Sequence, residues 1–457
     1  MEQQRNKKQN MSRKPLVYHD FNLRFASYNE AEGTFKVWVE GETLGGTMRP
    51  DDAFICSYEP EAFWNDSSTG SGGLLGDLER RRLKKEGMFA LGKMLADLAL
   101  PPGLVRDLFQ QSLSALQIGE GLRVRLHIDP AALTHLPWEF MALSQVSGEP
   151  QATDFLALRR EISIVRTDTV ETFMQPLPER PVARVVGVLS SPDGQMELDV
   201  SKDREAVEGA VQALCQATGQ NLIEVIWAKR PATREALMQA LAGGADIFHF
   251  AGHGVFIDSE GQVVLEKGDN TSDFYRGEQL AQLLHNAGVR LTVLGACETG
   301  RRNGRNIWGS IAGALTRQKI PAVVANQFKI RDGDAILLAA NIYPLILAGG
   351  TVDEAVYEAR QAIYQHNGLE DRDWGVPVLY LHDASGILFP TPETDTAEHS
   401  SHSPFLRVSD TFNKVRGHVV DVKIGVVTQG HIQINNKVDS VEKEGTFTTF
   451  EADQFGR

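Results

Sequence analysis

Apolar and polar positions follow two different periods in the first third of the chain. Residues 21–27 and 34–40 alternate apolar with polar side chains and flank a run of turn-forming residues, which predicts two strands joined by a turn. From residue 74 to residue 116 the apolar positions instead recur at every third or fourth residue, which predicts helices. Residues 122–128 return to a strand pattern. The first third therefore contains a β-rich segment followed by a mainly helical one.

Residues 183–384 are the most regular part, because short apolar runs alternate there with helical patterns. The predicted strands are residues 183–191, 222–229, 245–252, 290–297, 320–328 and 376–382, and the predicted helices are residues 201–214, 233–244, 277–288, 308–319, 332–348 and 352–366. Nearly continuous apolar strands that alternate with helices are typical of an α/β fold with a mostly parallel sheet covered on both faces. Right-handed crossovers then place the carboxyl ends of the strands at one edge, where ligands of such sheets bind.

Changes in composition divide the chain into several parts. A polar, basic N-terminus predicts a disordered tail, and a stretch rich in Pro, Ser, Thr and His predicts a linker near the C-terminus. The predicted parts are the tail (1–15), a β-rich segment (16–64), a helical subdomain (74–166), the α/β domain (183–384), the linker (385–403) and a small C-terminal segment (404–457).

Composition and charge exclude several classes of function. The 457 residues carry a net charge of −14, which repels phosphate backbones, so we expect no direct nucleic-acid binding. No run reaches the roughly 18 consecutive apolar residues that a membrane span needs, so we expect no membrane interaction. The three cysteines, Cys56, Cys215 and Cys297, are scattered and odd in number, which argues against a disulfide framework and for a reducing cytoplasm. Without a CxxC pair, a structural zinc site is not expected.

Candidate chemistry lies at the ends of two predicted strands. His253 follows the third strand of the α/β domain in a glycine-flanked turn, and Cys297 ends the fourth strand. A thiol peptidase needs a thiolate, a group that carries protons and donors for the oxyanion. Because both strand ends meet at one edge of the sheet, we predict that His253 and Cys297 act together. The backbone N–H groups of Gly254 and Cys297 are the predicted oxyanion hole.

Each of the two residues also has a structural interpretation. A single cysteine in an apolar strand commonly serves as a small core residue, and a single histidine near a turn commonly serves a structural role. The pair together, with glycines beside both members, favours the catalytic interpretation. A metal site is not expected, because one imidazole and one thiolate supply only half of a zinc shell.

These motifs resemble those of a known family. The segments HFAGHG (249–254) and LGACETG (294–300) together resemble the histidine and cysteine motifs of the CHAT family of caspase-like cysteine proteases. LPWEF (136–140) resembles an element that precedes the first strand in that family. VVGVLSSPDG (185–194) resembles the first strand and its loop, and IPAVVANQFKIRDGDA (320–335) resembles a strand and loop that follow the cysteine.

The resemblance covers residues 75–383 and implies both a fold and an activity. It implies a caspase-like three-layer sandwich, with residues 74–166 as a pro-caspase-like subdomain. It also implies a cysteine endopeptidase with a His253/Cys297 dyad and no metal or cofactor. Members are typically prokaryotic and act in antiviral defence or signalling, held inactive until an associated sensor changes state. Their protein substrates include gasdermin-like pore proteins, partners in defence systems and the protease itself. The alternative is a catalytically silent caspase-like scaffold that acts in protein assembly.

The resemblance also indicates where a substrate pocket lies. In caspase-like folds the residue two positions before the cysteine lines the pocket for the residue before the cut. That position is Gly295, which supplies space but no charge, so an uncharged or long apolar substrate residue is favoured. Asp332 and Asp334 could supply a carboxylate instead. The alternative is that Asp332 caps the helix that follows.

Three segments have no assigned chemistry. The basic loop at residues 300–306 could be a self-cleavage site or an ordinary solvated loop. The N-terminal β-rich segment and the C-terminal segment carry no catalytic motif, and we expect them to dock a sensor or adaptor protein.

Overall fold

The computed structural model describes most of the chain between residues 15 and 389 and a few short stretches beyond. The described residues are 15–64, 73–143, 148–167, 182–195, 198, 200–218, 223–258, 260–295, 297–298, 307–383, 385–389, 405–407, 426–427 and 431–433. The predicted disordered tail, except for residue 15, and the loop at residues 300–306 lie outside them, as do most of the linker and the C-terminal segment.

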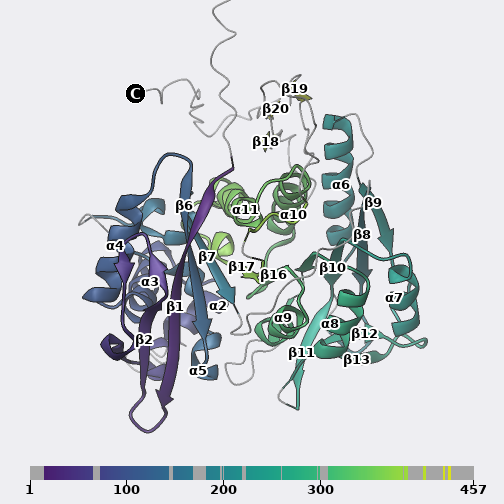
Figure 1. The fold of residues 1–457 in the computed structure, drawn as a ribbon. Coiled ribbons are helices and arrows are strands. Elements are labelled where there is room, and N and C mark those ends of the chain that lie inside the picture. Colours follow the sequence, from purple (N-terminus) through teal and green to yellow (C-terminus); the bar gives the residue numbers. More distant parts are fainter. Residues whose placement is uncertain are drawn as a thin grey trace, which may run out of the picture.

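One large sheet extends through the molecule (Figure 1), in the strand order β5-β2-β1-β6-β7-β17-β16-β14-β10-β8-β9. Its strands are β1 (Val17–Asn29), β2 (Thr34–Glu40), β5 (Phe54–Ser57), β6 (Glu120–Ile128), β7 (Ile162–Thr167), β8 (Ala183–Leu189), β9 (Ile223–Trp227), β10 (Ile247–Ala251), β14 (Leu291–Leu294), β16 (Ala322–Asn326) and β17 (Pro377–Leu381). Neighbouring strands run parallel except in the pairs β1–β2, β2–β5 and β16–β17. The prediction of an α/β fold with a large, mostly parallel sheet is confirmed.

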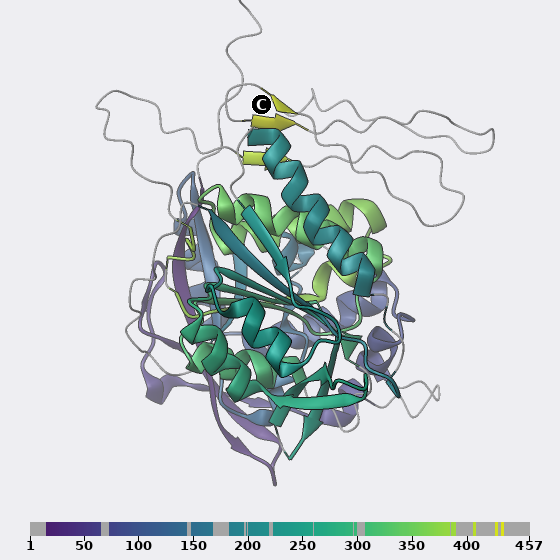
Figure 2. The ribbon, with the colours of Figure 1, turned by 90° about the vertical axis from the view of Figure 1, so that its right-hand side faces the viewer.

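Helices cover both faces of the half of the sheet that contains β8, β9, β10, β14 and β16 (Figure 2). On one face lie α6 (Val200–Thr218), α10 (Asp332–Leu347) and α11 (Val352–Asn367); on the other lie α7 (Arg234–Leu241), α8 (Gly277–Asn286) and α9 (Ile307–Arg317). Because strand side chains alternate between faces, Ile247 packs with the first group and Phe248 with the second. The predicted α10 and α11 are each confirmed to within one residue.

The N-terminal half builds its core on the predicted hairpin. β1 and β2 pair antiparallel, with Phe25 opposite Val37, and the turn between them contains Gly33 at a φ of +64°. Buried apolar residues of β1 pack with the helices α1 (Pro60–Trp64), α2 (Gly73–Glu79), α3 (Lys85–Ala99) and α4 (Leu104–Ala115). β1 also pairs parallel with β6. Strands from three of the predicted parts therefore belong to one sheet, and the division into domains stays a prediction.

A second, smaller sheet lies beside the large one in the order β13-β12-β11-β15. Its strands are β11 (His253–Ile257), β12 (Glu260–Glu266), β13 (Ser272–Arg276) and β15 (Cys297–Glu298). β12 packs on α9, since Val263 and Leu265 share a core with Ile311. The sequence pattern did not predict this sheet, which carries both candidate catalytic positions.

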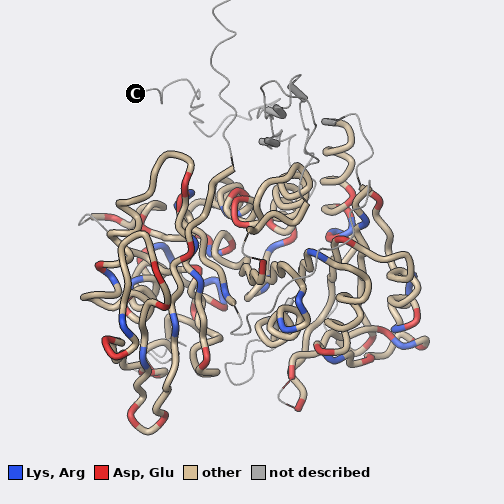
Figure 3. The backbone as a smooth tube through the Cα atoms, in the orientation of Figure 1, with Lys and Arg blue, Asp and Glu red and all other residues tan. Residues whose placement is uncertain are grey.

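The remaining elements are short. They are β3 (Glu42–Thr43), β4 (Gly46–Thr47), α5 (Ala131–Thr134), β18 (Phe405–Arg407), β19 (Val426–Val427), β20 (His431–Gln433), and the 3₁₀ turns η2 (Pro50–Asp52), η3 (Trp138–Phe140), η4 (Ala152–Asp154), η5 (Leu156–Leu158) and η6 (Asp373–Gly375). Acidic and basic residues are spread along the whole described chain rather than gathered in one region (Figure 3). Among the described residues no single helix is long and apolar enough to cross a bilayer; α3 and α4 meet the criterion only as a pair, bent by 103°.

Candidate active site

His253 opens strand β11 and its side chain is fully buried. β10 ends at Ala251, and Gly252 makes the bend between the two strands. A Cβ atom at Gly252 would lie 2.8 Å from the Phe250 ring and 3.0 Å from the Ser190 carbonyl oxygen, so only glycine fits the bend without a shift. The sequence predicted an imidazole in a glycine-flanked turn at the edge of the sheet. The structure instead starts a new strand at this residue and covers it.

The small sheet brings the backbone of Cys297 beside His253. β11 and β15 pair in parallel, with His253 opposite Cys297 and Gly254 opposite Glu298. Neighbouring strands lie about 4.8 Å apart, so the two Cα atoms are close enough for their side chains to reach each other. The side chain of Cys297 lies outside the described part of the structure, so the dyad stays a prediction that this register supports.

The predicted oxyanion hole lies in the same pair of strands. Gly254 is buried in β11. β11 has a neighbour on each side, since it also pairs antiparallel with β12, where Gly254 lies opposite Val263. Successive N–H groups of an inner strand point to alternate sides. The Gly254 N–H therefore faces one of the two neighbouring strands, and the role of the Gly254 and Cys297 N–H groups as an oxyanion hole stays a prediction.

The two aspartates that were candidates for the substrate pocket have other partners. The Asp332 carboxylate lies 2.6 Å from the Lys202 Nζ atom on α6. Asp332 is the first residue of α10, and the residue in the N-cap position is Arg331, whose side chain makes no capping bond. Asp334 is buried and accepts hydrogen bonds from Arg331 Nε at 2.9 Å and Asn367 Nδ2 at 2.8 Å. Neither aspartate lines the pocket at Gly295.

A different carboxylate lies at Gly295. Gly295 continues the line of β14 and donates a backbone hydrogen bond of 2.9 Å to Phe250. A Cβ atom placed on Gly295 would lie 3.2 Å from Asp203 Oδ1 and 3.6 Å from His249 Nε2. Asp203 and His249 line a pocket with Gly295, beneath α6 and α10. Sequence reasoning missed Asp203, because nothing in the chain marks which residue of a helical first turn faces a strand end.

His249 forms the floor of this pocket. Its Nδ1 atom lies 2.6 Å from the Tyr343 hydroxyl oxygen, and its Nε2 atom lies 4.0 Å from Asp203 Oδ1. Burial lowers the pKa of His249 to about 4, so the imidazole is neutral at pH 7. His249 is therefore a polar but uncharged residue in the lining of this pocket.

The lowered pKa of His249 makes stability depend on pH. The unfolded chain, with an ordinary histidine, binds more protons than the folded chain between pH 6.5 and about 4. Stability is therefore lost as the pH falls through this interval. Between pH 7 and pH 5 we expect the wild type to lose about 2 kcal/mol of unfolding free energy that His249→Gln does not lose. Urea unfolding at the two pH values measures the difference, and an equal loss in both proteins would contradict it.

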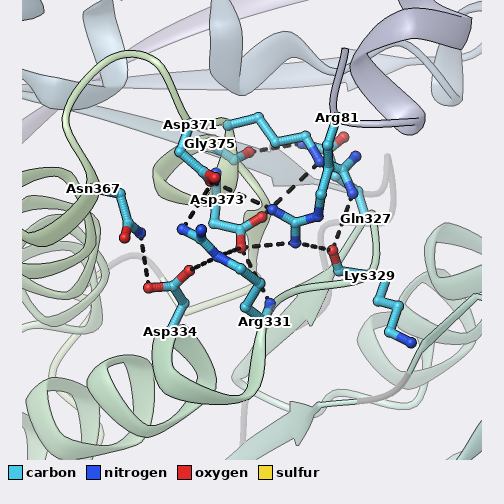
Figure 4. Close-up of polar contacts among 10 residues, drawn as sticks. Arg81, Gln327, Lys329, Arg331, Asp334, Asn367, Asp371, Asp373 and Gly375 are labelled. Carbon is cyan, nitrogen blue, oxygen red and sulfur yellow. Dashed lines mark hydrogen bonds and ion pairs between the residues drawn. The ribbon is translucent and has the colours of Figure 1, made fainter. Parts of the chain in front are cut away.

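A cluster of three carboxylates lies near the start of α10 (Figure 4). Oxygens of Asp334, Asp371 and Asp373 lie within 4.8 Å of one another, a spacing that a metal ion could use. Arg331 contacts all three, at 2.9, 3.0 and 3.3 Å, and Arg81 lies 2.8 Å from Asp373. Because guanidinium groups already supply the positive charge, we interpret the cluster as an ion-pair network that links the end of α2 to α10.

The LPWEF segment forms a second network, in the core. Glu139 is fully buried and accepts two hydrogen bonds from Arg166, at 2.6 and 3.0 Å. Gln327, which follows β16, donates to the same carboxylate at 2.9 Å. Trp138 is fully buried and donates to the Leu133 carbonyl oxygen at 3.1 Å. This motif therefore joins the N-terminal half to the α/β half.

Comparisons with known proteins give one match by sequence. The CHAT domain family model matches residues 90–406. No curated protein matches the chain. Similar solved structures include the Arg-specific cysteine proteinase gingipain R, with 12% identity, 72% of each chain covered and a TM-score of 0.36. The Saccharomyces cerevisiae separase–securin complex has 15% identity over 60% of this chain and 17% of that chain, with a TM-score of 0.34. The Drosophila initiator caspase Dronc has 11% identity over 46% of this chain and 84% of that chain, with a TM-score of 0.29.

Proposed function

The chain belongs to the CHAT domain family, and from this premise we propose that it is a cysteine endopeptidase in which His253 and Cys297 form the catalytic dyad. Family membership supports a cysteine peptidase. The observation that carries the dyad is the parallel register of β11 and β15, which sets Cys297 opposite His253. No other described histidine pairs across a strand register with Cys297.

The proposed mechanism uses two steps. The Cys297 thiolate attacks the scissile carbonyl carbon, and backbone N–H groups stabilise the oxyanion that forms. Protonated His253 gives its proton to the leaving amine as the C–N bond breaks, which leaves a thioester on Cys297. Neutral His253 then takes a proton from water, whose oxygen attacks the thioester. The acid product leaves, and the thiolate and protonated imidazole are restored.

The biological setting is part of the same proposal. The substrate is a protein, either a gasdermin-like pore protein or another partner in a prokaryotic defence or signalling system. A sensor or adaptor binds through the N- or C-terminal segments and activates the peptidase. The full burial of His253 supports a latent state, because a peptide needs access to the imidazole before cleavage.

The same burial favours the second candidate function. A histidine closed inside a small sheet also suits a catalytically silent scaffold that acts in protein assembly. The two candidates differ in whether the thiol of Cys297 is activated by a neighbouring imidazole.

Thiol reactivity separates the candidates. Burial raises the pKa of Cys56 to about 12, so this thiol stays protonated and inert at neutral pH. At pH 7.5 we expect iodoacetamide to label Cys297 in the activated protein at least about tenfold faster than Cys56 or the half-buried Cys215. Peptide mapping by mass spectrometry measures the three rates.

The matched control is His253→Ala. This variant should slow labelling of Cys297 and leave the rate at Cys215 unchanged. Equal rates at all three cysteines in the activated wild type would count against the peptidase and for the scaffold.

A further inference from the structure

A fully buried serine lies where the large sheet meets the small one. Ser190 directly follows β8. Its backbone N–H donates to the Ala251 carbonyl oxygen, at the end of β10, at 2.9 Å. Its hydroxyl donates to the Val264 carbonyl oxygen, in β12, at 2.7 Å. We call these two hydrogen bonds the Ser190 clamp, because together they fasten the small sheet to the large one.

Ser190 also contacts the bend that leads to His253. A Cβ atom at Gly252 would lie 3.0 Å from the Ser190 carbonyl oxygen, so the backbone of the bend passes close to Ser190. Gly252 stands between Ala251, which accepts a hydrogen bond from Ser190, and His253, which opens β11. The clamp therefore holds the chain immediately before the proposed catalytic histidine.

The other end of the clamp lies beside the histidine itself. Val264 is directly opposite His253 in the antiparallel pair of β11 and β12. Val263 and Leu265 pack in the core with α9, so alternation along the strand turns Val264 to the other face of the small sheet. His253 projects from that same face, because residues directly opposite in such a pair are neighbours on one face. A displacement of β12 therefore displaces a residue that borders the imidazole.

A second anchor keeps β12 in the same place along the large sheet. Glu266, the last residue of β12, is buried and accepts a hydrogen bond from the Ser191 N–H at 2.9 Å and from the Ala232 N–H at 2.6 Å. Arg230 Nη2 donates to the same carboxylate at 2.7 Å. Two consecutive serines thus bond to β12 at positions two residues apart, and the Ser190 bond is the one opposite His253.

The placement of His253 depends on how β12 is held. β11 lies between β12 and β15, and β15 has only two residues, so β12 is the longer of the two strands that support β11. A misplacement of about 1 Å that begins away from the reacting atoms can cost on the order of 10²-fold in rate. A bond that fixes β12 opposite His253 is therefore in a position to affect the chemistry.

On this basis, and resting on the proposed peptidase function, we propose that Ser190 is a positioning residue, whose hydroxyl holds β12 so that β11 places His253 beside Cys297. Ser190 acts through the small sheet and not on the substrate. Without the hydroxyl, the Val264 carbonyl oxygen loses this donor, β11 and β12 are held less tightly, and the imidazole spends less time beside the thiol.

The pH dependence of alkylation at Cys297 tests this role. An imidazolium beside a thiol favours the thiolate, so its loss moves the half-maximal labelling rate to a higher pH. In the activated full-length protein we expect His253→Ala to raise this midpoint for iodoacetamide by at least about one pH unit, and Ser190→Ala to raise it by at least about half a unit. The matched control is Ser163→Ala, which removes another buried hydroxyl, one that donates to Asp353 at 2.6 Å, and should leave the midpoint unchanged.

Hydrogen exchange measures the clamp without the thiol. In full-length Ser190→Ala we expect the backbone amides of residues 253–257 and 260–266 to exchange at least about threefold faster than in the wild type, because one hydrogen bond that resists local opening is lost. The amides of β1 and those of residues 253–266 in Ser163→Ala should exchange as in the wild type. Unchanged exchange of residues 253–266 in Ser190→Ala would overturn the proposal.

The two measurements separate this inference from the proposed function. If His253→Ala raises the midpoint and Ser190→Ala does not, the dyad stands and the positioning role is wrong. If neither variant raises the midpoint but exchange in β11 is faster in Ser190→Ala, the Ser190 clamp stands as a link between the sheets. The dyad, and with it the positioning role, is then wrong.

Discussion

Replacing Cys297 by alanine is expected to abolish peptide-bond cleavage while the protein still folds. Removing the nucleophile of a covalent mechanism costs on the order of 10⁴-fold or more in kcat, because the remaining groups only bind and orient the substrate. The substitution falls on a two-residue strand at the edge of the small sheet, so we expect little effect on stability. Mapping of new N-termini in activated cells, wild type against Cys297→Ala, measures the loss and also identifies the cut site.

His253→Ala is the companion to this experiment. A positioned proton carrier contributes about 10²- to 10⁴-fold, so this variant should keep a trace of activity that Cys297→Ala lacks. Cys215→Ala is the matched control, because it removes a half-buried thiol from α6 and should leave cleavage unchanged. Cleavage that persists in Cys297→Ala and is lost in Cys215→Ala would contradict the assigned nucleophile.

The pattern of apolar positions along the chain predicted the large sheet, because burial of the sheet requires that pattern. Strands of a parallel sheet with helices on both faces must be apolar at nearly every position, and β10, β14, β16 and β17 are buried throughout. The helices α10 and α11 were equally visible, since α10 is apolar over most of its length and α11 repeats apolar residues at helical spacing. Such signals are local, and the fold follows from them.

The small sheet was not predictable in the same way. β15 has only two residues, and β11 begins directly after a glycine bend. Neither has a run long enough to show a period. The sequence therefore indicated that His253 and Cys297 meet at one edge, and it missed the strand pairing that aligns them. A glycine-flanked histidine suggested an exposed turn, whereas packing against neighbouring strands buries it.

The pocket residues show the limit of reasoning from position along the chain. Asp332 and Asp334 were candidates because they follow β16, but Lys202 and Arg331 neutralise them. Asp203 lies more than ninety positions before Gly295, and only the packing of α6 over the sheet brings them together. Which face of a helix meets a strand end depends on the docking angle of the helix, and no local pattern encodes it.

The LPWEF motif leads to the prediction with the largest effect on stability. Glu139 and Arg166 form a fully buried ion pair, and removing one partner of such a pair costs about 3–5 kcal/mol, because the other charge stays buried without compensation. Glu139→Ala should therefore lower the free energy of unfolding by this amount and also leave Gln327 without one of its acceptors. Chemical denaturation of the full chain measures the loss.

The matched control for Glu139→Ala is Glu149→Ala. Glu149 pairs with Lys85 at 3.3 Å but its side chain is 82% exposed, so its loss should cost less than about 1 kcal/mol. A second variant, Glu139→Ala with Arg166→Met, removes both charges and should regain part of the stability, since an apolar pair no longer leaves a charge unpaired. If Glu139→Ala unfolds like Glu149→Ala, the motif does not anchor the two halves. If the double variant has a higher free energy of unfolding than Glu139→Ala, the unpaired buried charge of Arg166 is the cause of the loss.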